Sequence, residues 1–246
     1  IYAYQETCIQ HNKLRACASA LLTYVAEKAS AKYSDTIIVL NQRDASFLKK
    51  IYHRNVDVIL PTSFEDEGEN CEKRMIHAPL RYLFVGSAFF ANIQGINWFI
   101  EHVLPFVSGE LYVVGRGMSE VLREGRPQDR LRVVGEVDNV KDWYKQADIV
   151  VCPIFLGSGM KTKTAEAMMY GKPIVGTREA FVGYDVDPEK IGGCFDDARG
   201  MIDSLNRFEK NPERLEMCGQ YARTMFVEKY SFASSLDIMR RVFDND

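Results

Sequence analysis

Short apolar runs that each end at a turn residue recur through the second part of the chain. Five such runs occupy residues 82–85, 111–114, 131–134, 149–152 and 173–175, and they are followed by Gly86, Gly115, Gly135, Pro153 and Gly176. The runs are apolar throughout rather than alternating, which is typical of strands buried on both faces. The pattern therefore predicts five parallel strands, each followed by a turn.

Helix-like segments fill the gaps between these runs. They are predicted at residues 95–106, 118–123, 139–146, 161–170 and 200–208, with closing helices at 211–230 and 234–243. Strands that alternate with helices predict an α/β fold, here a doubly wound, Rossmann-like parallel sheet with helices on both faces. Ligands of such sheets bind at the carboxyl ends of the strands, so the turns after the strands are the expected place for a site.

The first 62 residues carry a shorter pattern. Residues 6–32 repeat apolar positions at steps of three and four, which predicts a long amphipathic helix. A strand at 36–40, a helix from Asp44 to Tyr52 and a second strand at 56–60 follow. The first residue is Ile rather than Met, and we expect more of this part to precede it in a longer protein. Residues 63–79 turn polar and acidic, which predicts a linker between domains.

Composition and charge exclude several classes of function. Apolar residues make up 46% and charged residues 26% of the chain, so a folded core is expected. The net charge of -3 has no basic footprint of the kind that nucleic acid requires, and no apolar run is long enough to cross a bilayer. Six cysteines without a C-x-x-C pair favour reduced thiols in the cytoplasm, and four histidines without ligand spacing predict no metal site.

The junction between the fourth strand and the following helix carries the strongest candidate chemistry. Gly157 and Gly159 permit backbone conformations that other residues avoid, and a helix is predicted to start near Met160. Free amides and the dipole at a helix N-terminus attract anions. Lys161 and Lys163 would oppose that dipole unless an anion lies there, so the pattern predicts a phosphate site.

Glu166 lies three residues beyond Lys163 on the same predicted helix face. For an isolated K-x-x-E pattern, a weak exposed ion pair is the more common outcome. Because this pair lies next to the glycine loop, we favour a second interpretation, in which Glu166 accepts hydrogen bonds from ribose hydroxyls and Lys163 contacts phosphate. Gly86 and Ser87, after the first strand, form a second turn that can face the same anion, although this signal is weak alone.

Residues 157–177, GSGMKTKTAEAMMYGKPIVGT, closely resemble the donor-binding motif of GT-B glycosyltransferases. The resemblance is strongest to the retaining bacterial group 1, family 4-like transferases that act on surface polysaccharides, and residues 83–87, 111–117 and 135–153 support it. It implies that residues 1–62 are a remnant of the N-terminal acceptor domain and 63–79 a linker. Residues 80–233 would be the nucleotide-sugar-binding domain, and 234–246 a closing helix that returns to the first part.

The resemblance also implies roles for individual residues. Glu166 would bind the ribose, and the diphosphate would be bound by Lys161, Lys163 and the amides near Gly159 and Met160. The base would be lined by Gly135, Glu136 and Val137. The distal phosphate or the sugar would be contacted by Gly86 and Ser87. Thr164 belongs to the same donor-binding set, and so does Ser158, which replaces an acidic residue that touches the donor sugar in many relatives. No catalytic residue is assigned.

The loop after the first strand departs from the family pattern. Many relatives carry Arg and Lys there, whereas residues 87–95 have no charge and Asn92 stands in the place of the Lys. We expect Lys161 and Lys163 to compensate for the missing charges. Two alternatives to a transferase stay open: a non-catalytic GT-B-like module that binds a sugar nucleotide, and a sugar-nucleotide epimerase.

The expected function is transfer of a sugar from a UDP- or GDP-linked donor to a polysaccharide or glycolipid acceptor, without metal or cofactor. The expected partners are the nucleotide-sugar donor and a saccharide or lipid-linked acceptor, with no nucleic acid. We expect a cytoplasmic protein, with contact to the inner face of the cell membrane only in the intact protein. The chain alone is expected to be inactive.

Overall fold

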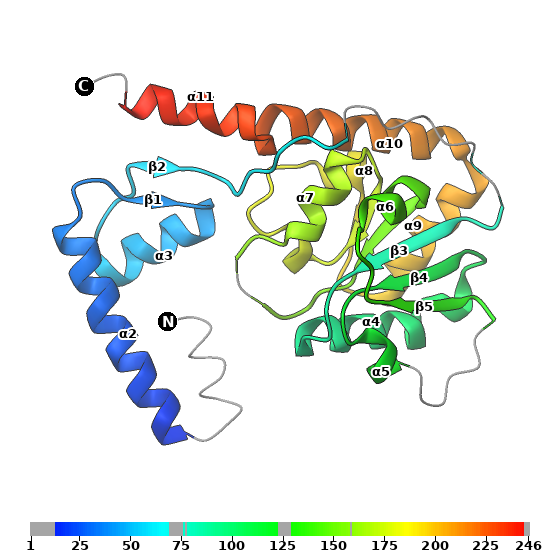
Figure 1. The fold of residues 1–246 in the computed structure, drawn as a ribbon, viewed down its shortest axis with the longest axis horizontal. Coiled ribbons are helices and arrows are strands. Elements are labelled where there is room, and N and C mark those ends of the chain that lie inside the picture. The colour runs from blue at the N-terminus through cyan, green and yellow to red at the C-terminus, as the bar shows by residue number, and fades with distance from the viewer. Residues whose placement is uncertain (1–12, 69–75, 77, 123–128, 158, 244–246) are drawn as a thin grey trace.

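The computed structural model describes residues 13–68, 76, 78–122, 129–157 and 159–243. The beginning of the predicted helix 6–32 and Ser158 therefore lie outside the described residues. Figure 1 shows a small first part, drawn in blue, beside a larger body built around a twisted sheet. The larger body contains every predicted donor-binding residue that the structure describes.

The larger body contains a six-stranded sheet in which every neighbouring pair is parallel. Its strands are β3 (Arg81–Val85), β4 (Glu110–Val114), β5 (Leu131–Gly135), β6 (Ile149–Cys152), β7 (Ile174–Gly176) and β8 (Gly192–Cys194), in the order β5-β4-β3-β6-β7-β8. The predicted doubly wound parallel sheet is confirmed, with its five strands. The sixth, β8, was missed because Gly-Gly-Cys has no apolar run, and a Cβ on Gly192 would lie 2.5 Å from the Ile174 carbonyl oxygen.

Helices fill the connections between the strands. They are α4 (Phe90–His102), α5 (Met118–Leu122), α6 (Lys141–Gln146), α7 (Thr162–Met169), α8 (Pro188–Ile191), α9 (Ala198–Lys210), α10 (Pro212–Met225) and α11 (Phe232–Phe243), with short 3-10 turns at Leu104–Phe106 and Arg178–Phe181 and a π-turn at Phe226–Tyr230. The predicted start of the first of these at residue 95 was wrong, because α4 begins five residues earlier. Gly95 lies inside α4, where a Cβ would come within 1.7 Å of the Pro153 carbonyl oxygen.

Alternate residues of the strands feed two separate cores. Tyr82 and Phe84 pack on one face of the sheet with apolar residues of α4, α5 and α9. Leu83 and Val150 pack on the other face with α6, α7 and the end of α10. Strands that are apolar on both faces are thus explained by a helix layer on each side of the sheet.

The first part consists of α2 (Lys13–Tyr33), β1 (Ile38–Val39), α3 (Gln42–Tyr52) and β2 (Val58–Ile59). The two strands pair in parallel, so the predicted strand, helix, strand unit is confirmed. The predicted start of its helix at Asp44 is corrected, because Asn41 is the N-cap and its side chain accepts the Asp44 amide at 3.0 Å. The predicted apolar stripe of α2 is not buried by the described residues, since Leu21, Leu22 and Val25 are more than half exposed.

The start of the predicted linker packs against the larger body. Phe64 forms an isolated bridge with Ser231, and Arg223 Nη1 donates to Asp66 Oδ1 at 2.7 Å. The Arg223 guanidinium holds the pKa of the Asp66 carboxyl below its usual value. Helix α11 starts beside this bridge, and Figure 1 shows it extending away from the sheet toward the side of the molecule where β1 and β2 lie.

Candidate functional site

The site lies where the strand order of the sheet reverses. From β3 the chain continues to β4 on one side, whereas β6, which pairs with the other side of β3, continues to β7. At this point Gly86 follows the carboxyl end of β3, and the loop at residues 153–161 follows the carboxyl end of β6. Crevices at such switch points are the usual ligand sites of doubly wound sheets.

Lys163 lies at this switch point, where a crevice is expected, in the first turn of α7. Its side chain is only 9% exposed, and its ammonium donates to Asn92 Oδ1 at 2.7 Å. The ammonium also lies 4.5 Å from the centroid of the Phe84 ring. A Cβ on Gly86 would come within 2.9 Å of it, and Asn92 in turn donates to the Ser87 carbonyl oxygen at 2.9 Å. The two turns predicted to face one anion are thus joined through Asn92.

The environment of Lys163 is electrostatically unusual. Burial, as the main cause, lowers the pKa of its ammonium to about 8, and the nearby Lys161 adds to that effect. Burial also raises the pKa of the neighbouring Cys152 thiol to about 11, so this cysteine supplies no negative charge at neutral pH. A cation in such surroundings is poorly screened by water and attracts an anion strongly.

Lys161 is held by a carboxylate that the sequence did not reveal. It occupies the N-cap position of α7 rather than its first turn, and its ammonium donates to Glu179 Oε1 at 2.7 Å and to the Gly159 carbonyl oxygen at 2.9 Å. Glu179 lies 18 residues further along the chain, in the 3-10 turn after β7. No local spacing links it to the lysine, so sequence reasoning could not find it.

The glycine loop has the backbone geometry that its sequence predicts. Gly157 and Gly159 adopt positive φ angles of 140° and 70°. Met160 packs beside Gly183, where a Cβ would lie 2.5 Å from its Cγ. The N-cap of α7 makes no side-chain capping bond, so the first amides of the helix keep their affinity for an anion.

Thr164 lies in the core and not in the crevice. Its side chain is fully buried, and its hydroxyl donates to the Ala180 carbonyl oxygen at 2.8 Å. The bond ties α7 to the 3-10 turn that carries Glu179. The Thr164 side chain therefore has a structural role, and the membership of Thr164 in the donor-binding set stays a prediction.

Glu166 is oriented by a tyrosine from the preceding helix. The hydroxyl of Tyr144, on α6, donates to Glu166 Oε2 at 2.8 Å. Tyr144 is fully buried and its ring stacks on Tyr170, with centroids 5.2 Å apart. Burial, followed by the charge of Glu166, raises the pKa of the Tyr144 hydroxyl well above its ordinary value, so this tyrosine stays a donor. The weak exposed pair between Lys163 and Glu166 is not formed.

The residues predicted to line the base lie at the carboxyl end of β5, two strands away from β3. Gly135 has a φ of 85°, and its carbonyl oxygen accepts the Gly115 amide at 2.7 Å. Glu136 is exposed and Val137 is half-buried. These residues share the carboxyl edge of the sheet with Gly86.

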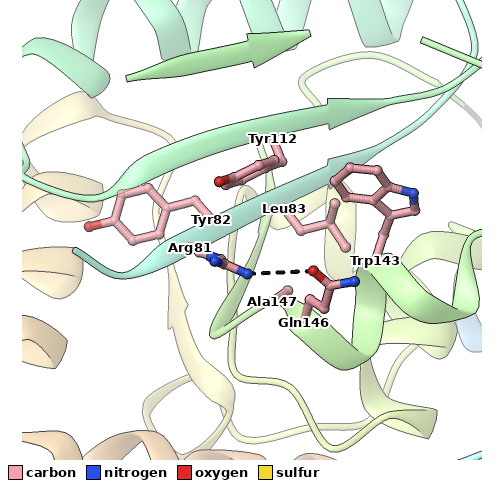
Figure 2. Close-up of a pocket in the computed structure, with 7 residues that line it drawn as sticks. All are labelled: Arg81, Tyr82, Leu83, Tyr112, Trp143, Gln146 and Ala147. Atoms are coloured by element: carbon pink, nitrogen blue, oxygen red, sulfur yellow. Dashed lines mark hydrogen bonds between the residues drawn. The ribbon is translucent and has the colours of Figure 1, made fainter. Parts of the chain in front are cut away.

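A small, partly open hollow of about 10 Å³ lies elsewhere, and Figure 2 shows its lining. Trp143 and Gln146 of α6 face Arg81 and Tyr112 of the sheet there, with Arg81 donating to Gln146 at 3.5 Å. Arg81 is the first residue of β3, so the hollow lies near the amino end of that strand. It is separate from the crevice at the carboxyl ends.

The residues that the structure describes contain neither a metal-binding cluster nor a membrane-spanning helix. In that part of the chain, no three His, Cys, Asp or Glu side chains come together in a group that would hold a metal ion. Within the same residues, no helix is both long and apolar enough to pass through a membrane.

Solved structures of similar fold are numerous. Sucrose-phosphate synthase from Thermosynechococcus elongatus has a TM-score of 0.73 at 18% identity, over 97% of this chain and 64% of that one. HepE from Anabaena with UDP and glucose scores 0.71 at 12% identity, over 90% and 66%. Staphylococcus aureus TarM (G117R) with fondaparinux, α-GlcNAc-glycerol and UDP scores 0.69 at 17%, over 88% and 45%.

These likenesses support the GT-B fold, and the chain spans less than two thirds of the synthase's length. A comparison with curated proteins gave no match. The sequence model of one protein family matches residues 79–211, which is more than half of the chain and includes the crevice, the glycine loop and helix α7. The chain therefore belongs to the family described as glycosyl transferases group 1.

Proposed function

We propose that this chain binds a UDP- or GDP-linked sugar in the crevice, and that the intact protein transfers the sugar to a saccharide or lipid-linked acceptor. The observation that carries the proposal is the burial of the Lys163 ammonium. This ammonium is buried at the N-terminus of α7, where Asn92 Oδ1 accepts a hydrogen bond from it. An ammonium has three donors, so N–H groups remain for the oxygens of a diphosphate.

A diphosphate fits the charge of this position. A buried ammonium is costly without a negative partner, and a phosphate oxygen compensates that cost through short, charge-assisted hydrogen bonds. The uncapped amides of α7 and the positive-φ glycines let the same anion approach the backbone closely. Lys161 and the turn at Gly86 and Ser87 complete the anion site.

We assign the nucleoside to other residues at the carboxyl edge of the sheet. Glu166, held by the Tyr144 hydroxyl, keeps its second carboxylate oxygen for ribose hydroxyls. Gly135 ends β5 at the carboxyl edge and Glu136 and Val137 follow it, and these three residues line the base. We leave Ser158, which stands where relatives carry an acid, as a contact to the donor sugar.

Transfer requires stabilisation of a leaving group and not a redox cofactor. As the bond between the anomeric carbon and the diphosphate oxygen breaks, negative charge builds on the nucleotide. Lys163 and Lys161 are fixed cations at that point, which is electrostatic stabilisation of the departing group. On this ground we propose metal-independent transfer with no cofactor besides the donor.

The ligands bound in the matching structures support the class of ligand. HepE was solved with UDP and glucose, and TarM with UDP and α-GlcNAc-glycerol. We propose a hexose donor of the same kind and an acceptor in polysaccharide or glycolipid assembly of the cell envelope. The intact protein would work in the cytoplasm, where it meets lipid-linked acceptors at the inner face of the membrane.

Calorimetric titration tests the donor site. The chain is titrated with UDP, GDP and their sugar conjugates in buffer with EDTA, and the Lys163→Ala and Glu166→Ala variants are measured beside it. Asp203→Asn, which removes one exposed charge on α9, is the matched control. We expect saturable binding of one nucleotide that both site variants lose and the control keeps. Absence of binding to every nucleotide, or unchanged binding by both site variants, would overturn the assignment.

Product analysis with the intact protein tests the reaction class. A transferase consumes the donor only when an acceptor is added. Conversion of the donor alone into an epimer would make the protein an epimerase. Binding without any turnover across saccharide and lipid-linked acceptors would make it a non-catalytic sugar-nucleotide module.

A further inference from the structure

Glu179 joins two cations that come from different parts of the molecule. Its Oε1 lies 2.7 Å from Lys161 Nζ, and its Oε2 lies 3.2 Å from Arg43 Nη1. The exposed fractions of the Glu179 and Lys161 side chains are 18% and 12%, so water screens their contact only partly. Arg43 belongs to the first turn of α3, 136 residues away from Glu179 in sequence.

The contact between Arg43 and Glu179 belongs to a packed junction. Asn41, the N-cap of α3, is 2% exposed, and its Cβ lies 3.1 Å from the position that a Cβ on Gly183 would take. Met160 of the glycine loop lies on the same glycine, with its Cγ 2.5 Å from that position. The start of α3, the segment after β7 and the glycine loop therefore meet at one place.

Lys161 is folded back over the loop that should receive the anion. Besides Glu179, its ammonium donates to the Gly159 carbonyl oxygen at 2.9 Å. Its Cε lies 3.4 Å from the position of a Cβ on Gly157. The carboxylate of Glu179 thus holds the lysine at the edge of the proposed diphosphate site.

We infer that the Glu179 carboxylate competes with the donor diphosphate for Lys161. In the free protein Glu179 pairs with both Lys161 and Arg43, and when a diphosphate binds Lys161, Glu179 keeps only Arg43 as its partner. The inference rests on the proposed function, because it needs a diphosphate in the crevice. A carboxylate and a diphosphate that share one ammonium repel each other, so Glu179 weakens donor binding. Arg43 reduces this penalty, because it offers the displaced carboxylate a second cation.

This exchange couples donor binding to the contact between the two parts of the chain. If Arg43 helps the donor to bind, the donor must strengthen the contact between Arg43 and Glu179 by the same factor. The first part, which bears α3, is then held more firmly against the donor loop once the donor is present. Glu179 is in this sense a positioning residue that acts through Lys161 and Arg43 and does not touch the reacting bond.

A double-mutant cycle with UDP, or GDP if that is the nucleotide bound, tests the exchange. We expect Glu179→Gln to tighten nucleotide binding about fivefold and Arg43→Met to weaken it about threefold, in the range measured for partly exposed ion pairs. The double variant should bind like Glu179→Gln alone, because Arg43 acts only through that carboxylate. In a Lys161→Ala background, Glu179→Gln should have no effect, and Asp203→Asn serves as the charge-matched control.

The alternative is that Glu179 merely holds the loop in shape. In that case Glu179→Gln would weaken binding, and the Arg43→Met effect would persist in the Glu179→Gln background. Either result would overturn the inference while the donor site itself stands. If the unaltered chain binds no nucleotide, the proposed function fails and this inference fails with it. Urea unfolding of each variant verifies that it is folded, and Glu179→Leu replaces Glu179→Gln if the latter is not.

Discussion

The ammonium of Lys163 and the side-chain amide of Asn92 form a 2.7 Å hydrogen bond that joins the first turn of α7 to the first turn of α4. The two helices follow β6 and β3, the strands between which the sheet order reverses. Asn92 also donates to the Ser87 carbonyl oxygen at 2.9 Å, so it has both a lysine and a turn as partners. A neutral amide thus takes the place of a charge in this loop.

Removal of the Asn92 amide is expected to affect both stability and binding. In Asn92→Ala, the buried Lys163 ammonium loses its oxygen acceptor, which should lower the free energy of unfolding by about 1 to 3 kcal/mol. Nucleotide affinity should fall as well, because the lysine is no longer aimed at the crevice. Asn92→Asp should keep the fold but weaken binding, since its carboxylate competes with the diphosphate. Urea unfolding and calorimetry measure the two effects, and unchanged affinity in both variants would contradict the expected role.

The depressed pKa of Lys163 predicts a pH dependence of stability with a definite sign. Its pKa is about 8 in the folded chain and 10.5 in an unfolded one. The unfolded state therefore binds more protons between these values, and stability must rise with pH in this window. Relative to Lys163→Met, the unaltered chain should gain about 2 kcal/mol between pH 7 and pH 9.5. Urea unfolding of both proteins across this range measures the difference, and a constant difference would show that Lys163 is not buried as a cation.

The same titration should affect the donor site in the opposite direction. Above about pH 8 the Lys163 ammonium loses its proton and with it the charge that attracts a diphosphate. We expect nucleotide affinity to fall as pH rises from 7 to 9.5, although the fold becomes more stable. Calorimetry at several pH values measures this trend. Lys163→Arg, which stays charged, is the control, and an equal decline in that variant would assign the effect to another group.

The hydrogen bond from Tyr144 to Glu166 predicts a selective loss of nucleoside affinity. Tyr144→Phe removes a donor at 2.8 Å from the carboxylate while the buried ring stays in place. Binding of UDP or GDP should weaken about threefold to tenfold, the range of one hydrogen bond. Tyr170→Phe is the matched control, because it removes a hydroxyl from the stacked ring without touching Glu166. Equal effects of the two variants would indicate general loosening of α6 and α7.

Two glycines near the crevice are expected to respond differently to a methyl group. In Gly86→Ala the Cβ would meet the flexible ends of Lys163 and Asn92 at 2.9 Å, so the fold should persist while nucleotide affinity falls. In Gly95→Ala it would meet the Pro153 carbonyl oxygen at 1.7 Å, and this backbone cannot move aside easily. We expect a loss of about 2 kcal/mol or more in the second variant, in the range for overpacked cores. Thermal unfolding and calorimetry separate the two outcomes.

Much of the fold and the location of the candidate site are local properties of the sequence. Apolar runs that end at glycine or proline predicted five of the six strands of the large sheet, because burial on both faces requires apolar residues throughout. The positive φ angles of Gly157 and Gly159 follow from the absence of a side chain. The short β8 escaped prediction, since its close approach to β7 depends on small residues and not on an apolar run.

The partners of the charged residues were decided by the tertiary structure alone. Lys163 bonds to a residue 71 positions away and Lys161 to one 18 positions away, and no spacing rule connects them. Sheet order brings β3 beside β6, and only this neighbourhood determines which side chains meet in the crevice. The sequence by itself determined that a glycine loop and a helix start follow the fourth predicted strand, which is where it predicts an anion site. Long-range packing decides which lysine is buried, which lysine is paired with a carboxylate and which carboxylate is oriented by a hydrogen bond. A local sequence pattern carries no information about long-range packing.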